Sequence, residues 1–122
     1  MGERIRALRG ATTLAADTKE QVIERTAELL RVMLERNGVA KYDIVSIVFT
    51  ATDDVVAEFP AAAARSIGIS DIPLLCAKEL SVRGAVQRCI RVLMHLYTSR
   101  EAGDLRHVYL EGAEPLRTDL PR

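Results

Sequence analysis

The sequence predicts a single small domain of the α+β class, and three segments carry this prediction. Residues 4–9 alternate with the period of two that is typical of a β-strand. Residues 18–36 place apolar side chains at helical spacing, which predicts one long amphipathic helix. Residues 44–51 are β-branched or apolar at nearly every position, a run typical of a strand that is buried on both faces.

Size and charge limit the functions that the chain can have. Its 122 residues have the length of one domain, which we assign to residues 1–122. The 17 basic and 17 acidic residues cancel, so no net field attracts nucleic acid or an anionic membrane, and we expect neither partner. A domain this small has limited room to surround a ligand, which makes sites between the subunits of an oligomer a natural expectation.

Signals for targeting and for metal binding are weak. The sequence has no run of about eighteen apolar residues, and its N-terminus lacks the long apolar core of a secretory signal. The two cysteines, Cys76 and Cys89, form no CxxC pattern and are expected to be reduced thiols of a cytoplasmic protein. Neither completes a zinc pattern with His95 or His107, so we expect no metal and no cofactor.

The first strand and the long helix have recognisable ends. The alternation over 4–9 ends at Arg9, where a charge continues an apolar face. Arg9 is interpreted either as a strand-end side chain that reaches solvent or as a binding residue. Asp17, three residues before Glu20, resembles a capping box and predicts the helix start, while Gly38 predicts its end.

The second half of the chain is predicted to contain one short helix and at least two strands. Pro60 suits the first turn of a helix over 61–67. The apolar run 72–77 predicts a strand, and residues 105–110 predict the final one. The segment 85–97 fits a helix by one spacing and a strand by another, and propensity alone leaves both open.

No conventional catalytic motif is present: the sequence lacks a GxSxG elbow, a glycine-rich phosphate loop and HExxH. Either cysteine could pair with a histidine as a nucleophile, but no spacing supports that geometry. Arg91 is more informative, because it lies within Cys-Ile-Arg-Val-Leu-Met and a buried arginine needs a carboxylate or a bound anion. An ion pair with Glu79 is the structural alternative. Several arginines around one pocket would instead suit a small dicarboxylate.

Five short segments carry a family resemblance. They are Arg-Gly-Ala-Thr-Thr at 9–13, Phe-Pro-Ala at 59–61 with Arg65, Cys76 with Glu79, Cys-Ile-Arg-Val at 89–92, and Arg-His-Val-Tyr-Leu-Glu at 106–111 followed by Leu116-Arg117. Together they resemble the monofunctional chorismate mutases of the AroH class. Each segment alone is a weak signal, but five in register are specific, and the resemblance spans about residues 5–120.

The resemblance implies a fold that the periodicities leave open. Members of this family are homotrimers that assemble as a pseudo-barrel. Each subunit is a five-stranded mixed β-sheet packed against one long and one short helix. On that template, the segment 89–97 is a strand and a neighbouring subunit covers the second face of the strand 44–51. The active sites would then lie in clefts between subunits.

The resemblance also implies catalytic roles. Arg9 resembles the arginine that holds the enolpyruvyl carboxylate, with help from Tyr109. Arg91 resembles the cation at the ether oxygen of the breaking bond. Glu79 resembles the acid that binds the ring hydroxyl, next to the backbone of Cys76.

A second set of contacts is implied around these residues. Phe59, Ala61 and Leu116 would supply apolar walls, and Arg65 and Arg117 would lie near the mouth. Phe59 and Arg65 would come from the neighbouring subunit.

Two positions depart from the family pattern. Ala62 stands where some members have a lysine, and Leu75 stands where a threonine occurs. Attraction for the ring carboxylate is therefore expected to rest more on Arg65 and Arg117.

The implied activity is that of an isomerase of the shikimate pathway: the intramolecular Claisen rearrangement of chorismate to prephenate, for phenylalanine and tyrosine biosynthesis. Electrostatic stabilisation and substrate orientation would suffice, which suits a chain without a catalytic triad or a cofactor motif. Two alternatives stay open. One is a small trimeric imine or enamine deaminase, and the other is a non-catalytic carboxylate-binding regulatory module.

Overall fold

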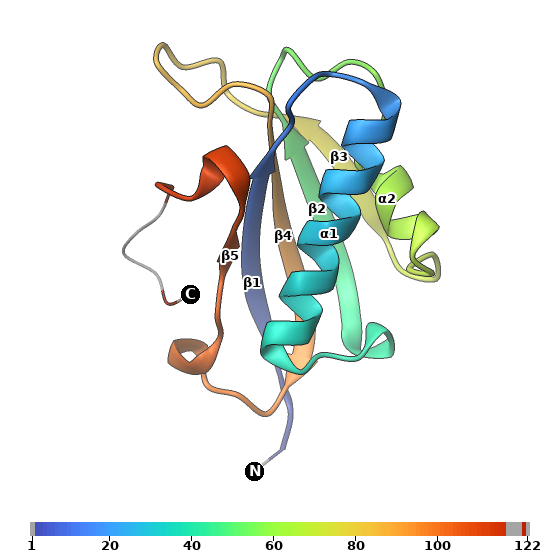
Figure 1. Cartoon of the computed structure of the whole chain (residues 1–122). Coiled ribbons are helices and arrows are strands. Elements are labelled where there is room, and N and C mark those ends of the chain that lie inside the picture. Colours follow the sequence, from blue (N-terminus) through green and yellow to red (C-terminus); the bar gives the residue numbers. More distant parts are fainter. Residues whose placement is uncertain (1, 117–120, 122) are drawn as a thin grey trace.

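The computed structural model describes residues 2–116 and residue 121, and within them the chain forms a five-stranded sheet with both α-helices on one face (Figure 1). In chain order the elements are β1 (Arg4–Thr13), α1 (Lys19–Asn37), β2 (Ile44–Ala51), α2 (Ala61–Ser66), β3 (Leu74–Lys78), β4 (Cys89–Thr98) and β5 (Val108–Tyr109). Short 3₁₀ turns occupy Lys41–Asp43, Ala102–Asp104 and Glu111–Ala113. The α+β class and the five-stranded mixed sheet are therefore confirmed.

The sheet has the strand order β3-β2-β4-β1-β5. The central strand β4 runs antiparallel to both of its neighbours, whereas β3 and β5 pair in parallel with β2 and β1 at the two edges. The ambiguous segment 85–97 is thus a strand from Cys89 onward. Pairing on both sides is a long-range interaction, which explains why local periodicity alone left the choice open.

The hydrophobic core lies between the helices and the inner face of the sheet. Alternate residues of β4, among them Val92 and Met94, point inward and are almost completely buried, as is Phe49 on β2. They pack with Leu29 and Met33 of α1. The predicted apolar face of the long helix is confirmed, and its end at Gly38 is marked by a left-handed φ of 60°.

Within the described residues, neither α-helix packs on the opposite face of the sheet (Figure 1), and only the short 3₁₀ turn Glu111–Ala113 covers one end of it, against Ala11 and Cys89. The ladder pairs Ile5 with Tyr97, Arg9 with Leu93, and Leu93 with Val48, so these residues share that outer face. Ile5 is 53% exposed and Tyr97 is 46% exposed, although both are large apolar side chains. The strand 44–51 is consequently covered on one face by the chain itself, with its second face open.

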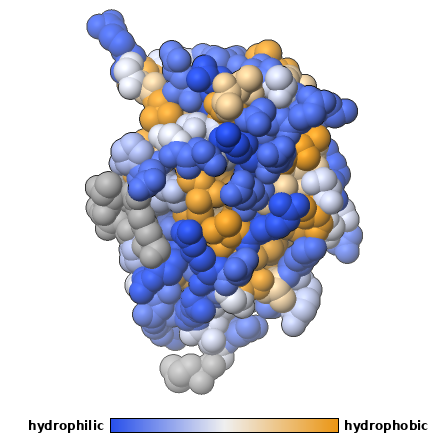
Figure 2. All heavy atoms as spheres, viewed as in Figure 1, coloured by the Kyte–Doolittle hydropathy of each residue, from blue (hydrophilic) through white to orange (hydrophobic). Residues whose placement is uncertain are grey.

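The surface on the helix-covered side is mostly hydrophilic. Hydrophilic side chains predominate there, with smaller apolar patches between them (Figure 2). None of the helices in the described residues is long and apolar enough to cross a membrane.

The first and the last predicted strands differ in length from the strands in the structure, and the strand predicted at 72–77 is β3, Leu74–Lys78. The first extends four residues beyond Arg9 to Thr13, because its second half pairs with β4 on one side and with β5 on the other. Gly10 permits a close approach there, since a Cβ at this position would lie 2.5 Å from the sulfur of Met33. The predicted strand 105–110 shrinks to Val108–Tyr109, because only these two residues pair with β1.

The predicted capping box at the start of the long helix is wrong. The N-cap is Thr18, whose hydroxyl accepts a hydrogen bond from the backbone N–H of Gln21 at 3.1 Å. The Asp17 carboxylate instead accepts the backbone N–H groups of Val56 and Ala57, at 3.0 and 3.1 Å. Asp17 therefore ties the loop before α2 to the start of α1, a long-range contact that local spacing does not reveal.

Replacement of Thr18 by alanine is expected to lower the free energy of unfolding by about 1 kcal/mol, because one N-terminal amide of α1 loses its acceptor. Thr18→Ser, which keeps the hydroxyl, is the matched control and should stay close to wild type. Chemical denaturation of the three proteins checks this. Equal stability of the alanine and serine variants would contradict the assignment of the cap.

Candidate active site

Three predicted site residues meet on the open face of the sheet. Arg9 from β1, Arg91 from β4 and Glu79, the residue that follows β3, line one cavity of about 230 Å³ together with Thr50. The register explains this, because Arg91 lies opposite Thr50 on β2 and Arg9 lies opposite Leu93, two residues further along β4. Both guanidinium groups therefore project from the same face, as diagonal neighbours on adjacent strands.

Arg91 and Glu79 form an ion pair inside this cavity. The Nε atom of Arg91 lies 3.3 Å from Oε2 of Glu79, and the two side chains are 29% and 22% exposed. The same carboxylate oxygen accepts a hydrogen bond from the hydroxyl of Thr50. The Nε atom is buried and has no hydrogen-bond partner in the described part of the chain, so its contact with Glu79 is electrostatic. The carboxylate therefore compensates the charge of Arg91 but does not accept a hydrogen bond from its Nε–H.

Cys89 lies behind Arg91 on the same strand and is not suited to nucleophilic chemistry. The thiol is completely buried, in a cluster with Ala11, Tyr109 and Ala113. Burial raises the pKa of Cys89, and the neighbouring Arg91 opposes that effect only in part. A thiol with a raised pKa is protonated at neutral pH and is a weak nucleophile. The cysteine–histidine alternative is therefore disfavoured at this position.

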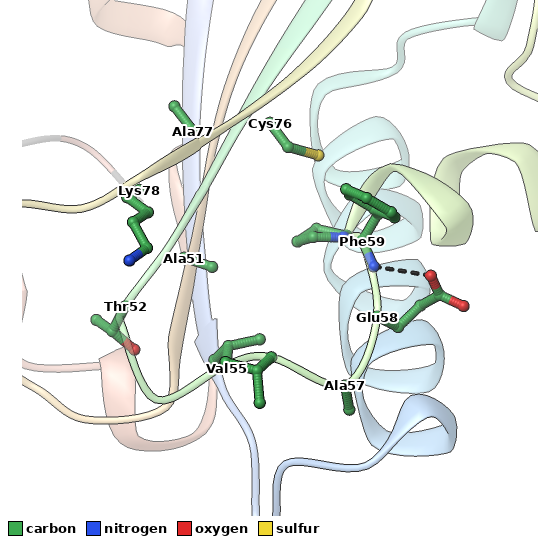
Figure 3. A pocket seen from close by; sticks show the side chains of 11 residues that line it. Ala51, Thr52, Val55, Ala57, Glu58, Phe59, Cys76, Ala77 and Lys78 are labelled. Carbon is green, nitrogen blue, oxygen red and sulfur yellow. Dashed lines mark hydrogen bonds between the residues drawn. The ribbon is translucent and has the colours of Figure 1, made fainter.

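A second cavity, of about 410 Å³, lies near the helix-covered face and the β3 edge of the sheet. Phe59, Cys76 and Lys78 line it, and Phe59 is 67% exposed (Figure 3). Cys76 faces this side because β3 pairs Cys76 with the inward-pointing Phe49.

The loop that presents Phe59 is ordered by local contacts. Asp17 accepts the amides of Val56 and Ala57, and the Glu58 carboxylate accepts the N–H of Phe59 at 2.8 Å. Pro60 then begins α2 as its N-cap residue. The aromatic ring is thus held at the rim of the second cavity.

The predicted site residues consequently fall into two groups within one chain. Arg9, Glu79 and Arg91 line the first cavity, whereas Phe59 and Cys76 line the second. Glu79 and Cys76, expected side by side, line different cavities of the same chain.

The remaining predicted residues line neither cavity. Tyr109 is buried in the cluster with Cys89, and Leu116 packs against that cluster. Ala61 is only 6% exposed and belongs to the core, while Arg65 is exposed on α2. Arg117 lies outside the described residues.

Among the lining residues that were not predicted, Thr50 and Lys78 are polar and contact a carboxylate. Thr50 donates to the Glu79 carboxylate, and its position opposite Arg91 emerges only from the strand register. Lys78 lines the second cavity, and its side chain lies 3.6 Å from the Asp53 carboxylate. A sequence feature could have indicated Lys78. It directly precedes Glu79 at the end of an apolar run, which is the position where a strand ends and its side chains reach the surface.

The fold and the first cavity together define a class: a small α+β protein whose sheet presents two guanidinium groups and a paired carboxylate on one open face. A sequence model of the family described as chorismate mutase type I matches residues 5–120. The chain belongs to this family.

Individual relatives are similar along nearly their whole length. The chain is 45% identical to a chorismate mutase AroH of Thermus thermophilus, over 95% of this chain and 96% of the relative. It is 41% identical to a chorismate mutase AroH of Bacillus subtilis strain 168, over 95% of this chain and 92% of the relative. A solved chorismate mutase from Clostridium thermocellum superposes with a TM-score of 0.89 at 45% identity, and the match covers 91% of this chain and 99% of that one.

Proposed function

We propose that this protein is a chorismate mutase, which converts chorismate to prephenate by an intramolecular Claisen rearrangement. The observation that carries the proposal is the grouping of Arg9, Arg91 and Glu79 around one cavity in a chain of this family. The relatives named chorismate mutase AroH align with this chain over at least 92% of their own length. We place the reaction in aromatic amino acid biosynthesis in the cytoplasm.

The residues on the open face suit a reaction that breaks a carbon–oxygen bond while it forms a carbon–carbon bond. No proton has to move, so fixed charge and orientation can supply the catalysis. Arg91 would place positive charge at the ether oxygen, where negative charge grows as the bond breaks. Glu79 would hold the ring hydroxyl, and Arg9 would bind the carboxylate of the side chain.

The complete site is proposed to lie between subunits of a homotrimer. Two features support this arrangement. The open sheet face exposes the large apolar residues Ile5, Leu93 and Tyr97, which a neighbouring subunit would cover. Each of the two cavities is lined by only some of the predicted site residues. In a trimer, the second cavity of one chain would lie against the first cavity of the next.

The second group of residues would then complete the site from the neighbouring chain. Phe59 would supply an apolar wall, Cys76 would contribute its backbone, and Arg65 would approach the ring carboxylate. Because Ala62 carries no charge, we assign more of that attraction to Arg65 and Arg117, and we add Lys78, the exposed ammonium on the rim of the second cavity.

Three other residues complete the proposed set. Tyr109 would assist Arg9, Leu116 would close the apolar wall, and Arg117 would lie near the mouth. The imine deaminase and the regulatory module are the competing functions, and only the mutase consumes chorismate and yields prephenate.

The purified protein is expected to turn over chorismate without any metal or cofactor, because the proposed mechanism rests on side-chain charges alone. Loss of chorismate absorbance and formation of prephenate should be unchanged after exhaustive chelation and dialysis. The control is the same protein before chelation. If activity disappears and returns only with an added metal or nucleotide, the proposed electrostatic mechanism is wrong. If no chorismate is consumed in either sample, the proposed function itself is wrong.

A further inference from the structure

A tight turn with two adjacent carboxylates follows β2. Its residues Thr52 and Val55 line the second cavity, whereas the two aspartates line neither cavity described above. The turn comprises residues 52–55 and is closed by a hydrogen bond from the Val55 N–H to the Thr52 carbonyl at 3.0 Å. We call it the aspartate turn. Its two acidic residues, Asp53 and Asp54, contact two different ends of the loop that connects β3 to β4.

Asp54 holds the end of that loop. Both of its carboxylate oxygens accept the backbone N–H of Arg88, at 3.0 and 2.9 Å, and the Thr52 hydroxyl donates to Oδ1 at 2.5 Å. Arg88 has a φ of 46°, a left-handed conformation that is unfavourable for a residue other than glycine. The carboxylate therefore stabilises a backbone geometry that the chain would otherwise avoid.

Thr52 links the aspartate turn to β4, the strand that carries Arg91. Its hydroxyl accepts the N–H of Cys89 at 3.0 Å, and its own N–H donates to the Cys89 carbonyl at 3.0 Å. Cys89 is the first residue of β4 and lies two positions before Arg91, on the same face of the sheet. The aspartate turn thus sets where the strand that carries Arg91 begins.

Asp53 holds the start of the same loop. Its carboxylate lies 3.6 Å from the Lys78 ammonium and accepts a hydrogen bond from the Ser81 hydroxyl. These two residues flank Glu79 in the chain, and the Glu79 N–H donates to the Ala51 carbonyl, next to the turn, at 2.9 Å. The backbone around Glu79 is thereby attached to the aspartate turn on both sides.

Both carboxylates are in the charge state that these contacts need. The hydrogen bond from Ser81, followed by the Lys78 ammonium, lowers the pKa of Asp53, and the hydrogen bond from Thr52 lowers the pKa of Asp54. A carboxyl with a lowered pKa is ionised at neutral pH and loses its contacts only as the pH falls through that lowered value. Ionised acceptors make stronger hydrogen bonds than neutral ones.

We propose that Asp53 and Asp54 are positioning residues for the Glu79–Arg91 pair: one fixes the backbone on both sides of Glu79, and the other fixes the start of the strand that carries Arg91. This inference rests on the proposed function. Neither aspartate lines the first cavity, so each acts through another residue. Their role is preorganisation, since a catalytic charge is effective only when its position is set before the reaction.

The test is a double-mutant cycle between Asp53 and Glu79. Asp53→Asn is expected to lower kcat for chorismate by about 10-fold or more, because a misplacement of about 1 Å in a catalytic group can cost on the order of a hundredfold. In a Glu79→Gln background, the Asp53→Asn change should alter kcat by less than about 2-fold. If the two residues acted independently, the change would lower kcat by the same factor in both backgrounds. Ser81→Ala removes the same contact from the other partner and should reproduce the single variant.

Asp54 is tested in parallel with a matched control. Asp54→Asn should lower kcat more than it raises KM, because the pair that it positions acts mainly in the transition state. Asp71→Asn changes an exposed aspartate whose side chain contacts Ser70, far along the chain from the turn, and should leave kcat unchanged. The thermal midpoint is measured for every variant.

Two outcomes would overturn the inference. The first is that Asp53→Asn lowers kcat and thermal stability by similar factors whether residue 79 is Glu or Gln. A merely structural role of Asp53 predicts this result. The second is unchanged turnover in Asp53→Asn, Ser81→Ala and Asp54→Asn. Failure of the proposed function is a separate result, because the unmodified protein would then not consume chorismate at all.

Discussion

Replacement of Arg91 by alanine is expected to lower kcat for chorismate by at least about a hundred- to a thousandfold, the loss typical of removing one preorganised donor from a developing negative charge. The substrate's ether oxygen gains charge only as its bond breaks, so the arginine stabilises the transition state more than the ground state. The Michaelis constant should therefore change less than kcat. Steady-state and single-turnover kinetics with chorismate measure the two effects separately.

Arg91→Lys is the matched variant for this experiment. Lysine keeps the positive charge but loses the planar arrangement of donors, so it should recover only part of the lost rate. The competing explanation is structural, because Arg91 already forms an ion pair with Glu79 at 3.3 Å. That explanation expects Arg91→Ala to lose thermal stability and yield, while the folded fraction turns over normally. A folded alanine variant with a near-normal single-turnover rate would exclude the catalytic role.

Mixing two inactive variants is expected to restore activity if the site is shared between subunits. Arg65→Ala and Arg91→Ala proteins should each be strongly impaired, because each lacks one arginine of every site. After co-refolding in equal amounts, a cyclic trimer with random composition should hold about one quarter of its sites with both arginines intact. The mixture should therefore reach up to about a quarter of wild-type kcat, measured as chorismate consumption.

The structure gives a reason to expect this recovery. In a single chain, Arg91 lines the first cavity with Glu79, whereas Arg65 is exposed on α2 and lines neither cavity. Each variant mixed with itself is the control. Mass spectrometry shows whether the subunits have exchanged. If both single variants are strongly impaired, the subunits have exchanged and the mixture still shows no gain in activity, then both residues act within one subunit's site. The shared-site proposal would then fail.

Local patterns predicted several elements closely. The strand expected at 44–51 coincides with β2, Ile44–Ala51, because a short run rich in β-branched residues favours the extended backbone of a strand. The helix expected at 18–36 is Lys19–Asn37, since its apolar spacing is strong and Gly38 ends it by a backbone preference of its own. Short-range sterics and periodicity carry this information, so neighbouring residues suffice to encode it.

Partners that are distant in the chain decided the rest. Asp17 was expected to cap a helix by its spacing, but its carboxylate holds the loop at 56–57, about forty residues away. The segment from 89 onward is a strand because β1 and β2 pair with it on both sides. Long-range pairing competes with local propensity, and its outcome is not visible in a short window of sequence.

The candidate site, too, was predicted in part from the sequence and in part decided by long-range contacts. Residue types in the sequence identified Arg91 as an unusual charge in an apolar run, Glu79 as a candidate ion-pair partner and Arg9 as a charge on an apolar strand face, and a family resemblance added their catalytic roles. Only the tertiary structure decided that these three share one cavity while Phe59 and Cys76 line another. The physical reason is the pleat of the sheet: the strand register determines which face each side chain occupies, and the register is set by partners far away in the chain.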